Sequence, residues 1–345
     1  MDVSGWIAFS DEFHRCQVAK MGSPEVLQNG SCLVYKAPPA SVLGNVLTVC
    51  SLFLLFGGCL VAPVVIAAVV VLAVMFPVIL CTVSAVLVST IFLARGPWPA
   101  FRRFPLFDHW RSFFSFRVAL EAPCPPKSLV AVFPHGVFPL GLFLASGAVE
   151  EIFPNHGPEV KHVGAVASVF FWLPLLAPLL TWIGCIPAHF RGIRDTLRSG
   201  GCIFLLPEGI AGVFQASFAR ERVFLKARKG FVRAAMSSGA NLVPAYVFGQ
   251  SHLLSVLPGS GSLLEKWSRK IRVSVSLFFG DFFLPIPRAI PVWLVVGEPI
   301  ACELNEAPSE EQVDRVHAVF CAALVALFER HKHAYGWGSK VLEIV

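Results

Sequence analysis

The stretch LVAVFPHG, residues 129–136, is the strongest indicator of the fold, because it predicts a strand followed by a turn into a helix. The same turn carries one imidazole, that of His135. A short β-prone run ends at Phe133, a proline and a glycine turn the chain, and residues 140–148 have a helical pattern. At such a turn a side chain projects into a cleft, and the N-terminus of the next helix points at it. Histidine is the side chain best suited to take up a proton near neutral pH, so His135 is a candidate general base. The alternative is a structural histidine that is satisfied by a hydrogen bond.

Short apolar runs alternate with helical stretches after Lys127, which predicts an α/β domain over residues 128–345. The expected strands are 129–133, 162–166, 184–187, 202–206, 242–248, 273–279 and 292–297. The expected helices are 140–152, 169–180, 193–199, 229–238 and 309–331. The last helix starts with a Ser-x-x-Gln capping box at Ser309 and Gln312.

Residues 37–94 contain no Asp, Glu, Lys or Arg. A membrane-spanning helix needs about 20 apolar residues, so this segment has room for two spans, expected near 42–61 and 65–93. We therefore expect a hydrophobic transmembrane hairpin of two helices over 37–94, N-terminal to the α/β domain; whether it spans or re-enters the bilayer stays open. Several arginines follow the hairpin, which predicts that both of its ends face the cytosol.

The flanking segments are less regular. Residues 1–36 have no periodicity and are expected to form an irregular cytosolic tail. Residues 95–127 mix aromatic residues with arginines, which is typical of a linker at a membrane interface; a loop packed on the α/β domain is the alternative.

Overall composition limits the partners. The chain has 345 residues, of which 55% are hydrophobic and 14% are charged, with 28 basic against 22 acidic residues. This mild positive balance suits an anionic membrane surface or a phosphate-bearing ligand rather than nucleic acid. The ten cysteines are scattered and no Cys-x-x-Cys pair occurs, so we expect neither a metal site nor a disulfide framework.

Two further stretches have residues suited to chemistry. The expected strand 202–206 runs into Pro207-Glu208-Gly209, and a carboxylate at that end of a parallel strand lies where α/β sites form. The alternative is a Pro-x-Gly turn with a solvated glutamate. Arg228, Lys229 and Arg233 belong to a basic run that enters the expected helix 229–238, a combination suited to phosphate groups, although many charge runs are only solvated faces. No Gly-x-Ser-x-Gly or His-Glu-x-x-His pattern occurs, which favours His135 acting directly on a bound hydroxyl.

These stretches resemble the type 2 diacylglycerol acyltransferase family, most closely its plant and algal branch. The resemblance covers about residues 90–345 and lies in five ordered blocks: Pro134-His135-Gly136 with 139–141, RKGFVR at 228–233, NLVPAYVFGQ at 241–250, VVGEPI at 295–300, and FERHK at 328–332. Three departures stand out. Phe133 replaces the His or Glu of most members, and Leu140 stands where related glycerophospholipid acyltransferases carry an Asp. The glutamate of the family would fall at Ala211, so Glu208 is expected to substitute for it.

The resemblance implies an α/β acyltransferase-like domain behind the hairpin, held at the endoplasmic reticulum membrane with its active domain in the cytosol, and also at lipid droplets. It implies transfer of a fatty acyl group from acyl-CoA, as substrate and without a cofactor, to diacylglycerol. His135 would be the general base, with Glu208 as its catalytic partner and the backbone at Gly136 holding the oxyanion. Arg228, Lys229 and Arg233 would bind the phosphates of acyl-CoA.

Two alternatives to this reading stay open. One keeps the chemistry with monoacylglycerol, a long-chain alcohol or a lysophospholipid as acceptor. The other is a non-catalytic acyl-CoA-binding or lipid-droplet scaffold. The lipid bilayer is expected as a partner and nucleic acid is not, whereas a homo-oligomer stays open.

Overall fold

The computed structural model describes residues 25–26, 31–75, 77–92, 96–153, 155–157, 159–218, 220–257, 259, 261–271 and 274–345. In this part of the chain, a nine-stranded mixed sheet has the order β1-β2-β3-β12-β9-β4-β7-β5-β6. Its strands are β1 (Glu25–Val26), β2 (Cys32–Lys36), β3 (Arg117–Leu120), β4 (Ser128–Phe133), β5 (His162–Val166), β6 (Cys185–Pro187), β7 (Cys202–Leu205), β9 (Asn241–Phe248) and β12 (Trp293–Val296). The central strands β9, β4, β7, β5 and β6 are mutually parallel.

Side chains alternate between the two faces of the central strands, as the two-residue period of a strand requires. In β4, Val130 and Val132 belong to one buried cluster, and Leu129, Ala131 and Phe133 to the other. The same alternation occurs in β9 and β12. The sheet is therefore buried on both faces, which explains why its strands are continuous apolar runs in the sequence.

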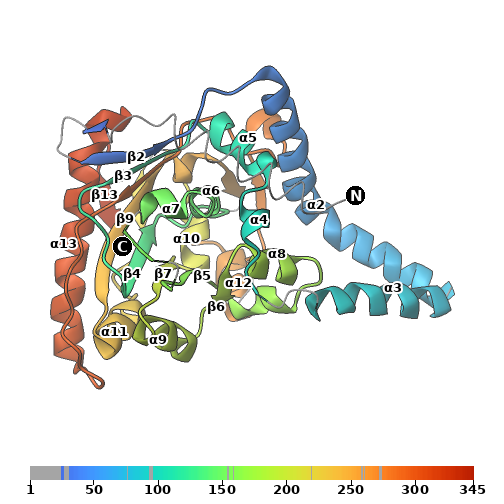
Figure 1. The fold of residues 1–345 in the computed structure, drawn as a ribbon. Coiled ribbons are helices and arrows are strands. Elements are labelled where there is room, and N and C mark those ends of the chain that lie inside the picture. The colour runs from blue at the N-terminus through green and yellow to red at the C-terminus, as the bar shows by residue number, and fades with distance from the viewer. Residues whose placement is uncertain are drawn as a thin grey trace.

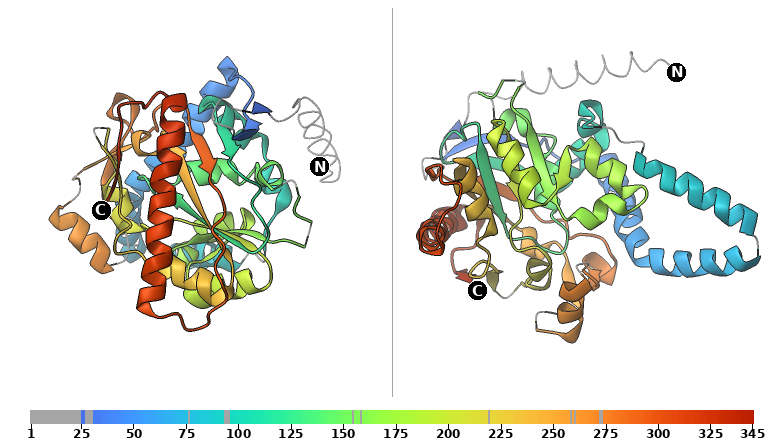
Figure 2. Two further views of the ribbon diagram at one scale, coloured as in Figure 1. Left: turned by 90° about the vertical axis from the view of Figure 1, so that its left-hand side faces the viewer. Right: turned by 90° about the horizontal axis from the view of Figure 1, so that it is seen from below.

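Helices cover both faces of the sheet (Figure 1). One face packs against α2 (Val42–Met75), α5 (Pro105–Phe113), α6 (Leu140–Ala145) and α7 (Val149–Ile152). The other packs against α9 (Phe190–Arg198), α11 (Gly230–Ser238) and α13 (Glu310–Tyr335), and Figure 2 shows α13 lying across that face. The remaining helices are α3 (Pro77–Ser89), α4 (Pro99–Arg102), α8 (Leu176–Trp182), α10 (Ile210–Phe214) and α12 (Leu263–Ile271), with 3-10 turns η1 (Thr90–Phe92), η2 (Ser168–Trp172), η3 (Gln250–His252) and η4 (Asp281–Phe283).

Two small two-stranded sheets complete the described part of the fold. β10 (Ser255–Leu257) pairs with β11 (Leu277–Phe279), and the C-terminal β13 (Leu342–Ile344) pairs with β8 (Glu221–Val223). The second pair ties the end of the chain to the segment that follows Glu208.

Most expected elements of the α/β domain are present within a residue or two. The capping box at α13 is confirmed: Ser309 Oγ accepts from the Gln312 amide, and the Gln312 side chain accepts from the Ser309 amide. Two expected helices are each divided into two pieces. Residues 140–152 form α6 and α7, and the run around 169–180 forms η2 and α8, interrupted before Leu176 at Leu173-Pro174. The expected strand 273–279 shortens to β11, and its residue 273 lies outside the described residues.

The expected membrane hairpin is wrong. No helix in the described ranges combines the length and the apolar character that a membrane span requires. Helices α2 and α3 do form an arm that extends from the sheet (Figure 2), but the first half of α2 belongs to the domain core. Leu52 and Phe56 are buried in that core, and Ser51 Oγ accepts from the indole N–H of Trp110 on α5 (2.8 Å). The sequence predicts lipid-facing helices here because it does not distinguish apolar residues that pack on a domain from those that face lipid.

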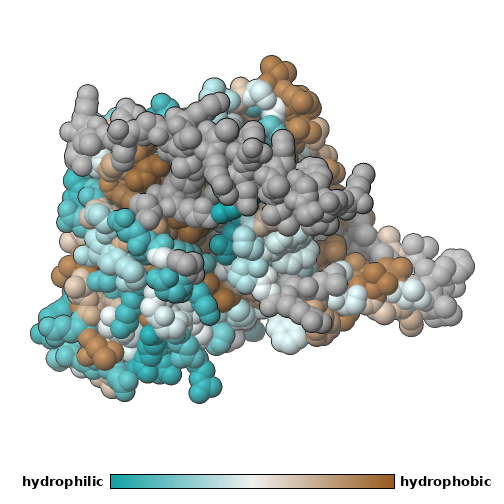
Figure 3. All heavy atoms as spheres, viewed as in Figure 1, coloured by the Kyte–Doolittle hydropathy of each residue, from teal (hydrophilic) through white to brown (hydrophobic). Residues whose placement is uncertain are grey.

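The segments on either side of this arm contribute to the sheet. β1 and β2 come from the expected N-terminal tail, whose residues 1–24 and 27–30 lie outside the described residues. β3 comes from the expected linker 95–127 and pairs with both β2 and β12. Apolar side chains are exposed over the start of α2 and along the arm (Figure 3), among them Val42 and Phe92. Trp172 on η2 and Phe282 on η4 are exposed as well.

Candidate active site

His135 lies in the turn that leaves the C-terminal end of β4. Its Nδ1 lies 2.8 Å from the carbonyl oxygen of Gly136. A carbonyl can only accept, so Nδ1 carries the proton and Nε2 keeps its lone pair. Burial lowers the pKa of His135 from its usual 6.5, and the bond to Gly136 offsets this only in part. The ring is therefore neutral at pH 7, and its Nε2 is in the form that a general base needs.

Glu208 lies beneath this turn with its side chain fully buried. Its Oε2 accepts from the backbone N–H of His135 at 2.6 Å, and its Oε1 accepts from the backbone N–H of Phe224 at 2.7 Å. Burial raises the pKa of Glu208 to about 7, although the two amides and the charge of Arg228 lower it. The carboxylate thus holds the backbone of His135 rather than its ring, which makes Glu208 a positioning residue.

Gly212 on α10 separates these two side chains. A Cβ added there would lie 2.6 Å from the Cβ of Glu208 and 2.8 Å from the Cβ of His135. Both distances are shorter than any normal carbon contact. Only glycine therefore lets α10 pack against the two residues at once.

Gln250 holds the turn from the opposite end. Its side chain is buried, its Oε1 accepts from the Gly141 amide (2.9 Å), and its Nε2 donates to the carbonyls of Phe138 (2.5 Å) and His135 (3.3 Å). Gly136 has a φ of +66°, and a Cβ there would lie 2.6 Å from Gln250 Nε2. The turn needs a glycine for both its backbone conformation and this close approach.

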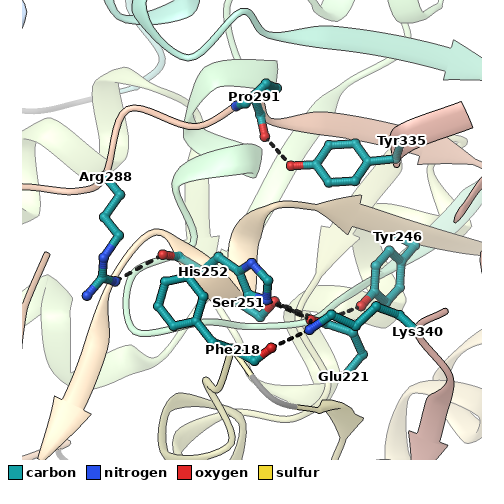
Figure 4. A network of polar contacts seen from close by, with 9 residues as sticks. All are labelled: Phe218, Glu221, Tyr246, Ser251, His252, Arg288, Pro291, Tyr335 and Lys340. Carbon is teal, nitrogen blue, oxygen red and sulfur yellow. Dashed lines mark hydrogen bonds and ion pairs between the residues drawn. The ribbon is translucent and has the colours of Figure 1, made fainter. Parts of the chain in front are cut away.

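A second buried carboxylate, Glu221 on β8, fixes the segment that carries Gln250 (Figure 4). Glu221 accepts from the hydroxyls of Tyr246 (2.9 Å) and Ser251 (2.8 Å), and it lies 3.1 Å from His252 Nε2. Because Ser251 and His252 directly follow Gln250, this network braces the amide side chain that clamps the His135 turn.

A groove of about 350 Å³ adjoins the 207–209 loop. It is lined by α9, by Leu205–Pro207 and by the start of α11 with Arg228, Lys229 and Gly230. Arg228 donates to the Glu208 carbonyl (3.1 Å), which ties the groove to the loop beneath His135. Arg228 and Arg269 both lie over the ring of Phe224, at 5.2 and 5.4 Å from its centroid. Burial and the charge of Arg269 lower the pKa of Arg228.

The sequence profile of the diacylglycerol acyltransferase family matches residues 85–344. The chain belongs to this family. It is therefore an acyltransferase, and the residues gathered around His135 lie within the matched region. The resemblance drawn from its five sequence blocks is confirmed.

Individual members of the family are similar over most of the chain. A diacylglycerol O-acyltransferase 2-like protein 6 from Bos taurus is 29% identical over 70% of this chain and 77% of its own length. Acyl-CoA wax alcohol acyltransferase 2 from Homo sapiens is 29% identical over 84% of this chain and 93% of its own length. Diacylglycerol O-acyltransferase 2 from Danio rerio is 28% identical over 70% of this chain and 71% of its own length.

Among solved structures, the crystal structure of the 1-acyl-sn-glycerophosphate acyltransferase PlsC from Thermotoga maritima has a TM-score of 0.38 and 14% identity. It covers 75% of this chain and 95% of that chain. A likeness at this level carries no argument about the site.

The structure brings most of the expected site residues together. His135, Gly136 and Glu208 form one hydrogen-bonded unit, and Arg228 joins it through the Glu208 carbonyl. Lys229 lines the groove and pairs with Asp314 (2.5 Å). Arg233 is placed differently, because it pairs with Glu310 and donates to the Pro308 carbonyl at the start of α13.

Phe133, one of the departures from the family pattern, is fully buried on the face of the sheet that α13 covers, with its ring 6.0 Å from that of Phe320. Its side chain therefore packs in the core between the sheet and α13.

The sequence did not reveal Gly212, Gln250 or Arg269 as site residues. Gln250 ends one of the five blocks, which was a usable signal. Gly212 and Arg269 lie in α10 and α12, outside every block, and only the fold brings them to the site.

We expect Gly212→Ala to lower the acyl-transfer rate about 10- to 100-fold, because the new methyl group displaces His135 or Glu208. Gly58→Ala is the matched control: it also puts alanine in a helix, at an exposed position outside the groove, and a Cβ there meets nothing within 4 Å. Rates measured on folded protein should fall only for Gly212→Ala. Equal rates for the two variants would show that the tight packing at Gly212 does not hold the site.

Proposed function

We propose that this acyltransferase moves a fatty acyl group from acyl-CoA to the free hydroxyl of a diacylglycerol, giving triacylglycerol. The observation that carries the proposal is the neutral His135 ring, whose Nε2 keeps its lone pair because Nδ1 donates to Gly136. Membership of the family and relatives named for this acceptor support the choice of substrate.

In the proposed reaction, His135 Nε2 takes the proton of the acceptor hydroxyl as its oxygen attacks the thioester carbonyl carbon. Backbone N–H groups in the turn at Gly136 hold the negative charge on the carbonyl oxygen. The carbon–sulfur bond then breaks, and the imidazolium returns its proton to the departing CoA sulfur. The low pKa of His135 favours this return, because the ring does not retain a proton at neutral pH.

We propose that the phosphates of acyl-CoA bind at the groove beside the 207–209 loop. The groove is within the size range of ligand pockets, and the N-terminus of α11 opens onto it with Arg228 and Lys229. Arg228 and Arg269 repel each other across Phe224, and a bound anion would relieve that repulsion. Arg233 is committed to Glu310, so we leave it out of this site.

A long-chain alcohol is the second candidate acceptor, because a relative named for wax alcohol matches 84% of this chain. Monoacylglycerol and a lysophospholipid remain as further outcomes of the acceptor test. We also propose that the protein lies at the endoplasmic reticulum membrane, with the bilayer as a partner. The exposed apolar side chains of α2 support this proposal (Figure 3). Fractionation of cells that express the chain, with organelle markers, tests it.

The direct test expresses the chain in yeast that lacks neutral-lipid synthesis and supplies membranes with labelled oleoyl-CoA and each acceptor in turn. We expect labelled triacylglycerol from diacylglycerol, and a loss of about 10²- to 10⁴-fold in His135→Ala, since that is what a general base contributes. His333→Ala, an exposed histidine on α13, is the control and should keep the parent rate. A different labelled product would reassign the acceptor. If none of the acceptors became labelled, a non-catalytic acyl-CoA-binding or lipid-droplet scaffold would be favoured. If His135→Ala made triacylglycerol at the parent rate, His135 would not be the general base.

Arg228→Ala should raise the KM for acyl-CoA by about 10-fold or more, because a charge-assisted bond to phosphate is lost. Arg233→Ala removes an arginine of the same basic run that points elsewhere, and it should leave this KM unchanged. Steady-state kinetics against acyl-CoA concentration compares the two. The groove would not be the phosphate site if both variants kept the parent KM, or if Arg233→Ala gave the larger increase.

A further inference from the structure

A cluster of three metal-ligating side chains lies away from the active site. His156, His162 and Cys202 each present one ligand atom, and within the described residues these atoms all lie within 4.8 Å of one another. His156 Nδ1 is 2.9 Å from His162 Nε2 and 4.0 Å from Cys202 Sγ. Ligand atoms around a tetrahedral zinc ion lie about 3.3–3.8 Å apart, as follows from bond lengths of 2.0–2.3 Å. The two separations of 2.9 and 4.0 Å lie just below and just above this range.

The sheet itself sets two of the three ligands. His162 opens β5 and Cys202 opens β7, and the two residues are directly paired in the parallel register. His156 comes from the loop after α7. Phe153 stacks on both imidazoles, at centroid distances of 4.8 and 4.7 Å, and the two imidazole planes are within 13° of parallel. The rings are thereby fixed with their nitrogen atoms facing each other.

Hydrogen bonding puts His156 in the tautomer that a metal requires. Its Nε2 lies 2.9 Å from the carbonyl oxygen of Cys124. That carbonyl can only accept, so Nε2 carries the proton and Nδ1 presents its lone pair to the cluster. A ligating histidine usually donates its second N–H to a carbonyl or carboxylate in this way.

A second thiol lies beside the cluster. The Sγ atoms of Cys124 and Cys202 lie 3.9 and 3.7 Å from the same carbonyl oxygen, that of Pro125. Cys124 is therefore a candidate for the fourth position of a tetrahedral site, although it is outside the group whose ligand atoms all lie within 4.8 Å of one another. Two imidazoles with one or two thiolates form a set that favours zinc among the common divalent ions.

We propose that His156, His162 and Cys202 bind a structural zinc ion that fastens the loop between α7 and β5 to the edge of the sheet. The cluster lies where β5 and β7 begin, whereas Glu208 follows the end of β7 and His135 the end of the parallel strand β4. The ion would thus lie at the N-terminal ends of the parallel strands, whereas His135 and Glu208 follow their C-terminal ends. The sequence predicts no metal site because it contains no Cys-x-x-Cys pair. The three proposed ligands extend over 46 residues of sequence, from His156 to Cys202, and meet only in the fold.

Metal analysis of the purified full-length chain tests the proposal. We expect about one zinc per chain in the parent protein and an affinity lowered about 100-fold or more in Cys202→Ser and His162→Gln. The matched controls are Cys302→Ser and His189→Gln, a thiol and an imidazole outside the cluster, and both should retain the metal. Zinc below one tenth of an equivalent in the parent, or equal zinc in Cys202→Ser and Cys302→Ser, would overturn the site and leave the two histidines as a hydrogen-bonded pair.

Cobalt substitution of the parent protein decides the question if a cluster variant fails to fold. A tetrahedral site with a thiolate gives strong visible absorption and a sulfur-to-cobalt charge-transfer band, and chelation should remove both while lowering the thermal unfolding midpoint. A spectrum without the charge-transfer band would exclude Cys202 as a ligand. Because none of these readouts measures acyl transfer, they are independent of the proposed function.

Discussion

The buried carboxylate of Glu208 is the constraint on which the site depends. It accepts the backbone N–H groups of His135 and Phe224, which come from turns 89 residues apart in the sequence. Two such bonds to an ionised acceptor are each worth about 1.5–3 kcal/mol, and burial of the carboxylate opposes them, as its raised pKa shows. The site therefore holds its histidine by the main chain and leaves the imidazole free to react. This arrangement differs from a triad, in which a carboxylate contacts the ring of the base.

The surrounding residues make this arrangement rigid. Gly212 lets α10 approach both His135 and Glu208, and Gln250 clamps the far end of the turn through three polar contacts. Glu221 in turn fixes the segment after Gln250. In the proposed mechanism this rigidity is what allows a lone imidazole to act as the base, because a base misplaced by about 1 Å loses much of its effect. Leu140 stands where related acyltransferases carry an aspartate that would orient the histidine. Here the backbone contacts to Glu208 and Gln250 orient the turn instead.

Sequence reasoning found the local features and missed those that depend on long-range pairing. The central strands were predicted because a sheet buried on both faces leaves continuous apolar runs. His135, Gly136 and Glu208 were found because they follow strand ends, and Arg228 because it belongs to a basic run that enters a helix. β1, β2 and β3 were missed because short edge strands carry little periodicity. The apolar run at 37–94 was assigned to a hairpin across the membrane, since composition does not show that Leu52 and Phe56 pack on the domain. Gly212 and Gln250 act through spatial contacts that no spacing in the sequence encodes.

The dependence of kcat on pH in Glu208→Gln tests the central claim most directly. In the parent enzyme, Glu208 takes up a proton as the pH falls through about 7, which converts one of its two acceptor oxygens into a donor and releases an amide. We expect kcat of the parent to fall over that range. In Glu208→Gln it should be lower by about 10-fold or more throughout, with the KM for acyl-CoA unchanged. The pH at which its kcat falls on the acid side should move below 6.5, because burial lowers the pKa of His135 from that value. A variant with the parent kcat and the parent pH dependence would show that Glu208 does not hold His135 in place for the proposed reaction.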